Sequence, residues 1–259
     1  MWSIKRKVQR SGGQRLTMKI YSKTDIGKTR SSNQDAVKTG KISDSLAWSV
    51  VCDGMGGVAG GDVASDIAVL TISSYLNEEL SANKNSKEIK NVVYEAVNSA
   101  NKAIYLKSQN DISLKNMGTT VILCVLNGDD LHVVHVGDSR AYLIDENNIN
   151  QITIDHSMVQ EMLSSGKITV DEAKNHPQKN VITRALGVSE EVEIDYNHLK
   201  IKQGNIVMLC TDGLTNHVDE SRIHEICKEN DLSQVPQILI DEGNKNGGSD
   251  NITVSVIEY

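Results

Sequence analysis

The sequence predicts an α+β fold in which antiparallel sheets pack against amphipathic helices. Three observations support this: short apolar segments typical of buried strands, a hairpin signal in the middle of the chain, and longer segments with apolar residues at helical spacing. The strands and helices do not alternate regularly, as they would in a doubly wound parallel sheet. With 259 residues, 39% of them hydrophobic, the chain suits one sizeable domain or two small ones.

The predicted strands are rich in β-branched and apolar residues. They cover 45–53, 119–126, 131–138, 140–144, 205–212 and 251–258. The second and third are joined by Asn127-Gly128-Asp129-Asp130, and Asn-Gly supplies the positive φ angles of a tight hairpin. Because hairpins connect neighbouring strands, we expect the central strands to pair antiparallel.

The predicted helices carry apolar residues at intervals of three and four. They cover 62–80, 87–106, 220–229 and 232–244. Segment 156–187 differs, since it is polar, interrupts the strand pattern and contains Gly166 and Pro177. We expect it to be an insertion over a face or edge of the sheets, where insertions often border active sites.

Composition limits the function and the location. The formal net charge is -7 and the sequence pI is about 5.5, so the chain is a poor candidate for binding nucleic acid through bulk charge. No apolar run approaches the roughly 20 residues that a membrane helix needs, so we expect no membrane insertion. The four cysteines have no zinc-knuckle spacing and lie mostly in strand-like runs, which indicates core residues without disulfides and a cytoplasmic location.

The first 17 residues are basic and lack the apolar segment of a secretory signal. We expect a flexible basic leader over 1–17, and a basic docking arm is the alternative.

Aspartates stand at the ends of several predicted strands. Asp53, Asp138 and Asp212 each end a strand beside a glycine, and Asp250 precedes the last strand. The end of one antiparallel strand lies beside the start of its neighbour, so these carboxylates can meet at one edge. Carboxylates in close contact raise one another's pKa, and a divalent cation removes that penalty. Oxygen ligands without Cys or His favour Mg²⁺ or Mn²⁺. The alternative for each residue is a turn, where Asp-Gly pairs are common.

The segment TDIGKTRSSNQDA at 24–36 places a cation, Arg30, and an acid, Asp35, just before the first predicted strand. It is either a solvated loop or a site in which Arg30 binds a phosphate while Asp35 supports the metal ligands. Other motifs are missing: the glycines at 56–61 lack the Gly-Lys-Ser/Thr of a P-loop, and there is no HExxH. The consecutive residues Asp155, His156 and Ser157 cannot face one another as a catalytic triad.

A set of segments, taken in order and spacing, resembles a metal-dependent Ser/Thr protein phosphatase of the phosphatase 2C type (PPM family) in its compact bacterial form. They are TDIGKTRSSNQDA, VVCDGMGGVAGGDVAS, MGTT, HVGDSRAYLI, DHSMV, NVITRALG, LCTDGLTN and GGSDNITV, and the resemblance covers 18–259. It implies a single phosphatase domain with a four-layer α-β-β-α sandwich, two central antiparallel sheets flanked by helix pairs. It also implies that 156–187 is a mobile flap.

The resemblance further implies a binuclear Mn²⁺ or Mg²⁺ centre. By position, Asp53 would bridge two tightly bound ions and the Gly54 carbonyl would bind one of them. Asp212 and Asp250 would bind the other ion. A third, weaker ion would fall to Asp138 together with Asp212.

Arg30 matches the arginine that binds substrate phosphate in this family, and we group Asp35 with it as a catalytic residue. We expect Gln34 and Asn251 to support the ligands from behind. The sequence departs from the family at two positions: Gln34 replaces a glutamate, and Met55 stands where animal relatives have a histidine that could act as general acid.

The implied activity is hydrolysis of phosphoserine and phosphothreonine esters by direct attack of a metal-bridging water. The expected partners are phosphorylated proteins, among them a bacterial Ser/Thr kinase and its substrates, and the expected state is a monomer. Two alternatives remain: a catalytically weak or dead scaffold of the same fold, suggested by Gln34, and a metal-dependent hydrolase of another ester.

Overall fold

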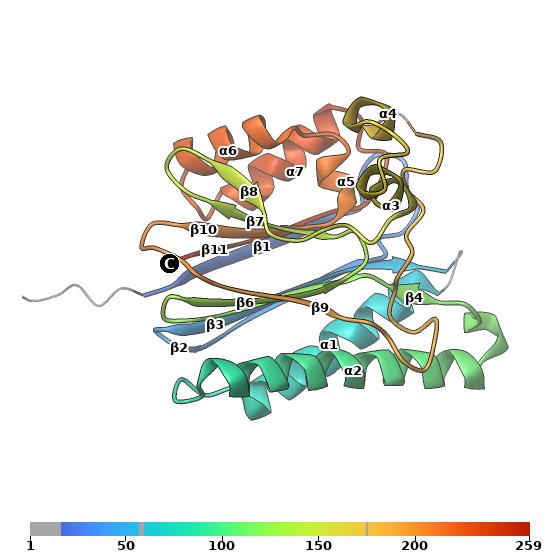
Figure 1. The fold of residues 1–259 in the computed structure, drawn as a ribbon, viewed down its shortest axis with the longest axis horizontal. Coiled ribbons are helices and arrows are strands. Elements are labelled where there is room, and N and C mark those ends of the chain that lie inside the picture. Colours follow the sequence, from blue (N-terminus) through green and yellow to red (C-terminus); the bar gives the residue numbers. More distant parts are fainter. Residues whose placement is uncertain (1–16, 57–59, 175) are drawn as a thin grey trace, which may run out of the picture.

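The computed structural model describes residues 17–56, 60–174 and 176–259 (Figure 1). Its strands are β1 (Lys19–Asp25), β2 (Asp35–Ser43), β3 (Leu46–Met55), β4 (Gly118–Thr119), β5 (Val121–Asn127), β6 (Asp130–Val136), β7 (Arg140–Ile144), β8 (Ile149–Gln151), β9 (Asp195–Lys200), β10 (Ile206–Cys210) and β11 (Ile252–Glu258). Its helices are α1 (Gly61–Glu79), α2 (Ser86–Asn110), η2 (Ile112–Leu114), α3 (Met158–Ser164), α4 (Val170–Lys174), α5 (Asp212–Thr215), α6 (Glu220–Glu229) and α7 (Val235–Lys245).

The elements form four layers, and the predicted α+β sandwich is confirmed. The first sheet has the strand order β1-β11-β10-β7-β8, and the second has β2-β3-β5-β6-β9 with β4 paired to β3. All these pairings are antiparallel. Helices α1 and α2 cover the outer face of the second sheet, and α6 and α7 cover the outer face of the first (Figure 1).

Three apolar cores hold the layers together: one under α1 and α2, one under α6 and α7, and one between the sheets. Strand β3 shows how the sequence produces this arrangement. Trp48 and Val50 point into the core under α1 and α2, whereas Ala47 and Val51 point into the core between the sheets. Because both faces of β3 are buried, its sequence is a continuous apolar run rather than an alternation.

The sequence missed β1, β2, β8 and β9. These four are the outermost strands of their sheets, and they are rich in polar residues. Of the two alternatives for the segment 24–36, the solvated loop is wrong for Asp35, since Asp35 is buried, begins β2 and pairs with Asp53 of β3. The structure also moves two strand ends: Asp138 lies beyond the end of β6, and Asp212 begins α5.

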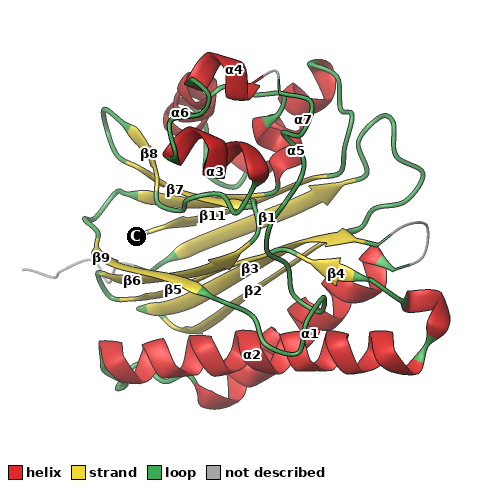
Figure 2. Ribbon diagram, turned by 45° about the vertical axis from the view of Figure 1, so that its right-hand side comes forward, coloured by secondary structure: helices red, strands yellow, loops and turns green. Residues whose placement is uncertain are grey.

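Segment 156–187 leaves and re-enters the sheets at one place. The N–H of His156 donates to the carbonyl of Gly137 (2.9 Å), and the N–H of Thr183 donates to the carbonyl of His156 (2.8 Å). Ser157 and Ile182 form an isolated antiparallel bridge. Between these anchors the segment carries α3 and α4, which lie on the same side of the molecule as α5 and α7 (Figure 2).

Within the described residues, no helix is long and apolar enough to span a membrane. The four cysteines are buried and unpaired. The predicted leader falls outside the described part of the chain except for Thr17.

Candidate metal centre

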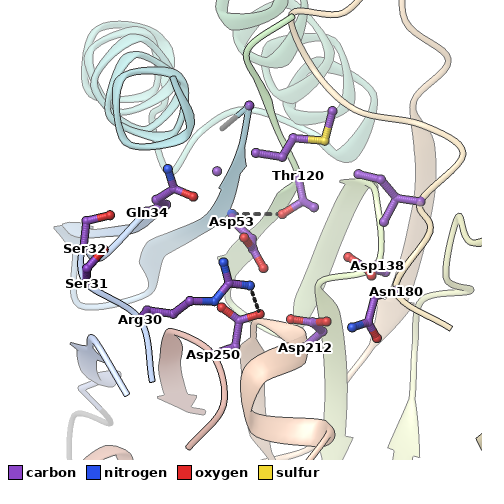
Figure 3. A pocket seen from close by; sticks show the side chains of 14 residues that line it. Arg30, Ser31, Ser32, Gln34, Asp53, Thr120, Asp138, Asn180, Asp212 and Asp250 are labelled. Atoms are coloured by element: carbon purple, nitrogen blue, oxygen red, sulfur yellow. Dashed lines mark hydrogen bonds and ion pairs between the residues drawn. The ribbon is translucent and has the colours of Figure 1, made fainter. Parts of the chain in front are cut away.

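A pocket of about 480 Å³ opens where both sheets end, and the four predicted aspartates line it (Figure 3). Asp53 comes from β3, Asp138 follows β6, Asp212 begins α5 and Asp250 precedes β11. Two sheets thus bring together carboxylates that are separated by up to 197 residues in the chain, as the sequence predicted. Asn180, from segment 156–187, completes one wall.

Two threonines fix the backbone of Asp53. Its N–H donates to Thr120 Oγ1 (3.0 Å), and its carbonyl accepts from Thr119 Oγ1 (2.8 Å) and from the Thr120 N–H (2.8 Å). Thr120 Oγ1 also shares a hydrogen bond of 2.7 Å with Ser139 Oγ, beside Asp138. The sequence assigned no role to these threonines, although the segment MGTT contains both.

Gly54 lies in a space that admits no side chain. A Cβ at this position would lie 2.0 Å from the carbonyl oxygen of Gly61 and 2.6 Å from that of Gln34. The N–H of Gly54 donates to the same Gln34 carbonyl (3.0 Å). Glycine is required here because the backbone segments approach so closely.

Asp212 and Asp250 have different neighbours. Asp212 Oδ2 accepts from Asn216 Nδ2 (3.0 Å), one turn further along the chain. Asp250 Oδ2 forms an ion pair with Arg30 Nη2 at 2.8 Å, and its Oδ1 accepts from the N–H of Asn251 (2.8 Å). The side chain of Arg30 is 50% exposed at the rim of the pocket, so the arginine lies beside the carboxylates and remains open to solvent.

Asp35 does not line the pocket. It is buried behind Asp53, where its Oδ2 accepts from Thr211 Oγ1 (2.9 Å) and Thr253 Oγ1 (2.6 Å). Its Oδ1 is buried and has no hydrogen-bond partner among the described residues. Burial raises the pKa of Asp35 to about 7, with smaller contributions from Asp212 and other carboxylates. The geometry gives Asp35 no direct access to a substrate.

Gln34 and Asn251 connect the arginine-bearing loop to β11. Asn251 Oδ1 accepts from the N–H of Gln34 (2.8 Å), and its Nδ2 donates to the carbonyls of Ile26 (2.9 Å) and Ser32 (3.0 Å). Asn251 is buried, whereas Gln34 lines the pocket. Asn251, the residue next to Asp250, therefore holds the loop that carries Arg30 in place beside Asp250.

The electrostatics of the pocket favour a cation. Burial raises the pKa of Asp53 well above its usual range, and Asp35, Asp212 and Asp138 raise it further. The pKa of Asp138 is raised to about 7 by burial and then by Asp212, and burial and Asp250 raise the pKa of Asp212. Among the residues that the structure describes, the lining offers several carboxylate oxygens and one arginine, but no cysteine or histidine. Such a donor set fits hard divalent cations, Mg²⁺ or Mn²⁺.

An acidic pocket at the ends of two stacked antiparallel sheets, with an arginine on its rim, is typical of metal-dependent hydrolases that act on anionic substrates. The comparisons with known proteins specify the family: the model of the family described as "Protein phosphatase 2C" matches residues 27–235. This chain belongs to the protein phosphatase 2C family.

The relatives agree over most of the chain. The "Serine/threonine phosphatase stp" of Listeria monocytogenes serotype 4b is 38% identical over 237 residues, covering 91% of this chain and 94% of the relative. The solved serine/threonine phosphatase of S. agalactiae is 34% identical with a TM-score of 0.87, covering 93% and 99% of the two chains. The catalytic domain of the phosphatase PstP, solved in complex with 2 manganese ions, is 31% identical with a TM-score of 0.81, covering 93% and 97%.

Proposed function

We propose that this protein is a metal-dependent protein serine/threonine phosphatase, which hydrolyses phosphoserine and phosphothreonine esters in proteins. The observation that carries the proposal is the convergence of four carboxylates and one arginine on a single pocket. The family and the names of the relatives support the same activity.

We propose that the pocket binds two Mn²⁺ or Mg²⁺ ions tightly and a third more weakly. Asp53, the Gly54 carbonyl, Asp212 and Asp250 would hold the tight pair, and Asp138 together with Asp212 would hold the weaker ion. The phosphatase PstP, whose structure contains 2 manganese ions, supports the count of two. Bound divalent cations would lower the pKa of a water molecule and neutralise charge on the phosphate.

The residues of the chain have separate tasks in this proposal. Arg30 binds and orients the phosphate through its guanidinium group, which suits two phosphate oxygens at once. Thr119 and Thr120 hold Asp53 in place, and Asn251 holds the loop of Arg30. Water is the nucleophile, so no phosphorylated side chain is formed.

The central test measures hydrolysis of phosphoserine and phosphothreonine peptides with Mn²⁺, with and without EDTA. We expect turnover that requires the metal and that EDTA abolishes. If the purified, folded protein bound Mn²⁺ but released no phosphate, it would be a scaffold of the same fold. Faster hydrolysis of another ester, such as a nucleic acid, would redirect the proposal to that ester.

We further propose a physiological setting. Residues 18–259 form a single monomeric phosphatase domain in the cytoplasm, with 156–187 as its flap and 1–17 as a leader. Its substrates are phosphorylated proteins, among them a bacterial Ser/Thr kinase and the targets of that kinase. Unpaired buried cysteines fit a reducing compartment, and sedimentation analysis of the purified chain tests the monomer.

A further inference from the structure

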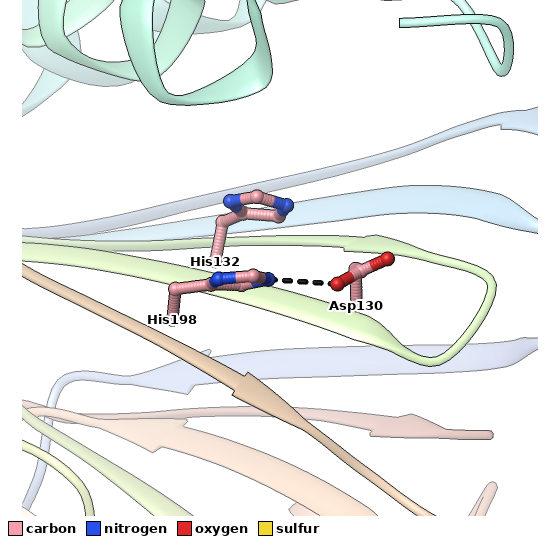
Figure 4. A group of neighbouring side chains, drawn as sticks. All are labelled: Asp130, His132 and His198. Carbon is pink, nitrogen blue, oxygen red and sulfur yellow. Dashed lines mark hydrogen bonds and ion pairs between the residues drawn. The ribbon is translucent and has the colours of Figure 1, made fainter. Parts of the chain in front are cut away.

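Two histidines and an aspartate meet on the second sheet, at the opposite end of β6 from Asp138 (Figure 4). Asp130 and His132 lie on β6, and His198 on β9 is the direct cross-strand partner of His132. The imidazole rings of the histidines stack with their centroids 4.6 Å apart and their planes 15° apart. His198 Nε2 lies 2.7 Å from Asp130 Oδ1.

One nitrogen in this group lacks a partner. The side chain of His132 is 1% exposed, and its Nδ1 forms a hydrogen bond of 2.8 Å with the hydroxyl of Tyr196. Its Nε2 is buried and makes no hydrogen bond within the described part of the chain. A buried polar atom without a hydrogen-bond partner is unfavourable, and an ion bound at this nitrogen would satisfy it. Figure 4 shows the outer nitrogen of His132 on the same side as the His198 nitrogen that faces Asp130.

The group has the composition and size of a metal site. Asp130, His132 and His198 each offer one ligand atom, and these atoms lie within 4.8 Å of one another. Metal–ligand distances of about 2.0–2.2 Å place the ligands of a tetrahedral zinc ion about 3.4 Å apart, so the group must contract slightly. His198 lies on an edge strand, and its side chain is 35% exposed. It is the ring that can turn out of the stack to complete the site.

The protonation states also suit a metal. Burial, followed by the neighbouring His198, lowers the pKa of His132 to about 4, so this imidazole is neutral at physiological pH. A hydrogen bond from its Nδ1–H to Tyr196 would leave the lone pair of Nε2 for the ion, as is usual for metal-bound histidines. At His198, the ion would take the place of the hydrogen bond between Nε2 and Asp130 Oδ1.

Two lysines work against a cation here. Lys200 Nζ lies 2.9 Å from Asp130 Oδ2 and 2.8 Å from Asp129 Oδ1. Lys90 of α2 lies over the ring of Tyr196, 4.6 Å from its centroid. The side chain of Lys200 is exposed and can keep its bond to Asp129 when Asp130 turns to an ion. The lysines lower the affinity of the site without blocking it.

We propose that Asp130, His132 and His198 form a Zn²⁺ site that ties the edge strand β9 to β6, with water as the fourth ligand. Imidazole ligands select zinc over the Mg²⁺ and Mn²⁺ that suit the acidic pocket. The two sites lie at opposite ends of β6, and this proposal does not depend on the phosphatase activity.

The test is a calorimetric titration of the metal-free protein with Zn²⁺ in a large excess of Mg²⁺. The variants are His198→Gln and Asp130→Asn, both at partly exposed positions, which avoids changing the buried His132. His224→Gln is the matched control, because this half-buried histidine of α6 lies outside both metal sites and its Nε2 is 3.1 Å from the carbonyl oxygen of Asp145. Replacing His224 changes no residue of either metal site.

We expect the unaltered protein and His224→Gln to bind one more equivalent of Zn²⁺ than His198→Gln and Asp130→Asn. The ring nitrogens of His132 and His198 should shift in ¹⁵N NMR spectra when that equivalent binds, and the melting temperature should rise because zinc binds the folded state. Phosphatase activity with Mn²⁺ should be equal in all four proteins. An equal zinc count in all four proteins, or unshifted histidine signals, would overturn the proposal.

Discussion

The aspartates of the acidic pocket have different neighbours, so replacing each of them should have a different effect. Asp53 lies between the two threonines of MGTT and the remaining carboxylates. Asp138 lies to one side, where it also borders a second cleft of about 590 Å³ beside α3. These positions agree with the proposal that Asp53 serves both tight ions and that Asp138 serves only the weaker one.

The first prediction compares Asp53→Ala with Asp138→Ala. Asp53→Ala should lose the tight metal pair and nearly all activity, because generation of the nucleophile and charge neutralisation depend on the same ligand. Asp138→Ala should keep two ions and lose the third, with reduced activity at low Mn²⁺. Calorimetric counting of bound Mn²⁺ decides between them. Loss of the tight pair in Asp138→Ala, with retention in Asp53→Ala, would invert the assignment.

The second prediction concerns Arg30→Ala. Removing one charge-assisted contact to phosphate should lower kcat/KM about 10- to 100-fold, mainly through KM. Affinity for Mn²⁺ should not weaken, because Arg30 pairs with Asp250 and its removal frees that carboxylate. Arg222→Ala on α6 is the control, since Arg222 is partly exposed and forms ion pairs with Glu225 and Glu242, which lie outside the pocket. Loss of metal binding in Arg30→Ala would refute its assignment to phosphate.

The third prediction concerns Thr120→Val, which keeps the shape of the side chain and removes its hydroxyl. The N–H of Asp53 and the hydroxyl of Ser139 then lose a partner, so the free energy of unfolding should fall by about 1–3 kcal/mol. Activity should fall while two ions still bind. Thr39→Val, at a half-buried position of β2 that does not line the pocket, is the control. Urea denaturation and Mn²⁺ titration of both variants provide the measurements, and unchanged stability would argue against the role of Thr120.

At the residue level, the sequence predicted the pocket aspartates because Asp53, Asp138 and Asp212 each follow an apolar run beside a glycine, and Asp250 precedes another apolar run. It could not reveal what Thr119, Thr120 and Asn180 do. Short polar residues acquire a role only once β3 pairs with β4 and segment 156–187 returns over the pocket. The burial of Asp35 depends in the same way on β2 pairing with β3.

At the level of elements, the sequence predicted central strands and missed edge strands. β3, β5, β6, β10 and β11 are buried on both faces, so their apolar runs are visible in the sequence. β1 and β9 are edge strands, and their residues are exposed or half-buried. Missing β9 also hid the zinc candidate, because His132 and His198 become neighbours only through the pairing of β6 with β9.

The fourth prediction concerns segment 156–187, which is anchored at its base and carries exposed serines at 164–165. Replacing Ser165 with Lys should change rates on phosphoproteins several-fold and leave p-nitrophenyl phosphate hydrolysis nearly unchanged. A protein substrate extends beyond the pocket towards α3, whereas the small ester does not, and loops at the rim of an active site gate access. Lys substitution at exposed Ser81, beyond α1, is the control. Equal effects on both substrates would count against a substrate-binding role for this segment.

At the scale of the whole molecule, the fold brings several buried carboxyl groups together at one end of the two sheets, where their negative charges repel one another. Three apolar cores order two sheets, and their joint edge gathers Asp35, Asp53, Asp138 and Asp212 with raised pKa values. Composition and periodicity predicted the class of fold, because central strands and long helices determine the layers. The closeness of the carboxylates depends on the register between strands, which periodicity alone does not specify.

The fifth prediction follows from this charge. In the metal-free protein, a carboxyl whose pKa is raised on folding binds more protons in the folded state than in the unfolded state between about pH 4 and about pH 7. The free energy of unfolding should therefore fall as the pH rises through that window, by about 1.4 kcal/mol per pKa unit for each such group. His135 and His156 oppose this trend, because burial lowers their pKa values.

Comparing the unaltered protein with Asp138→Asn separates the effect of the carboxyls from the opposing effect of the histidines. Asp138→Asn removes one of the carboxyls, so its metal-free melting temperature should fall less between about pH 5 and about pH 7.5 than that of the unaltered protein. Saturating Mn²⁺ should raise the melting temperature more at the higher pH, because the ion binds the ionised carboxylates and the protons compete with it. Scanning calorimetry of both proteins, with and without Mn²⁺, gives the four curves. If Asp138→Asn and the unaltered protein showed the same pH dependence without metal, Asp138 would not carry the raised pKa that the pocket geometry gives it.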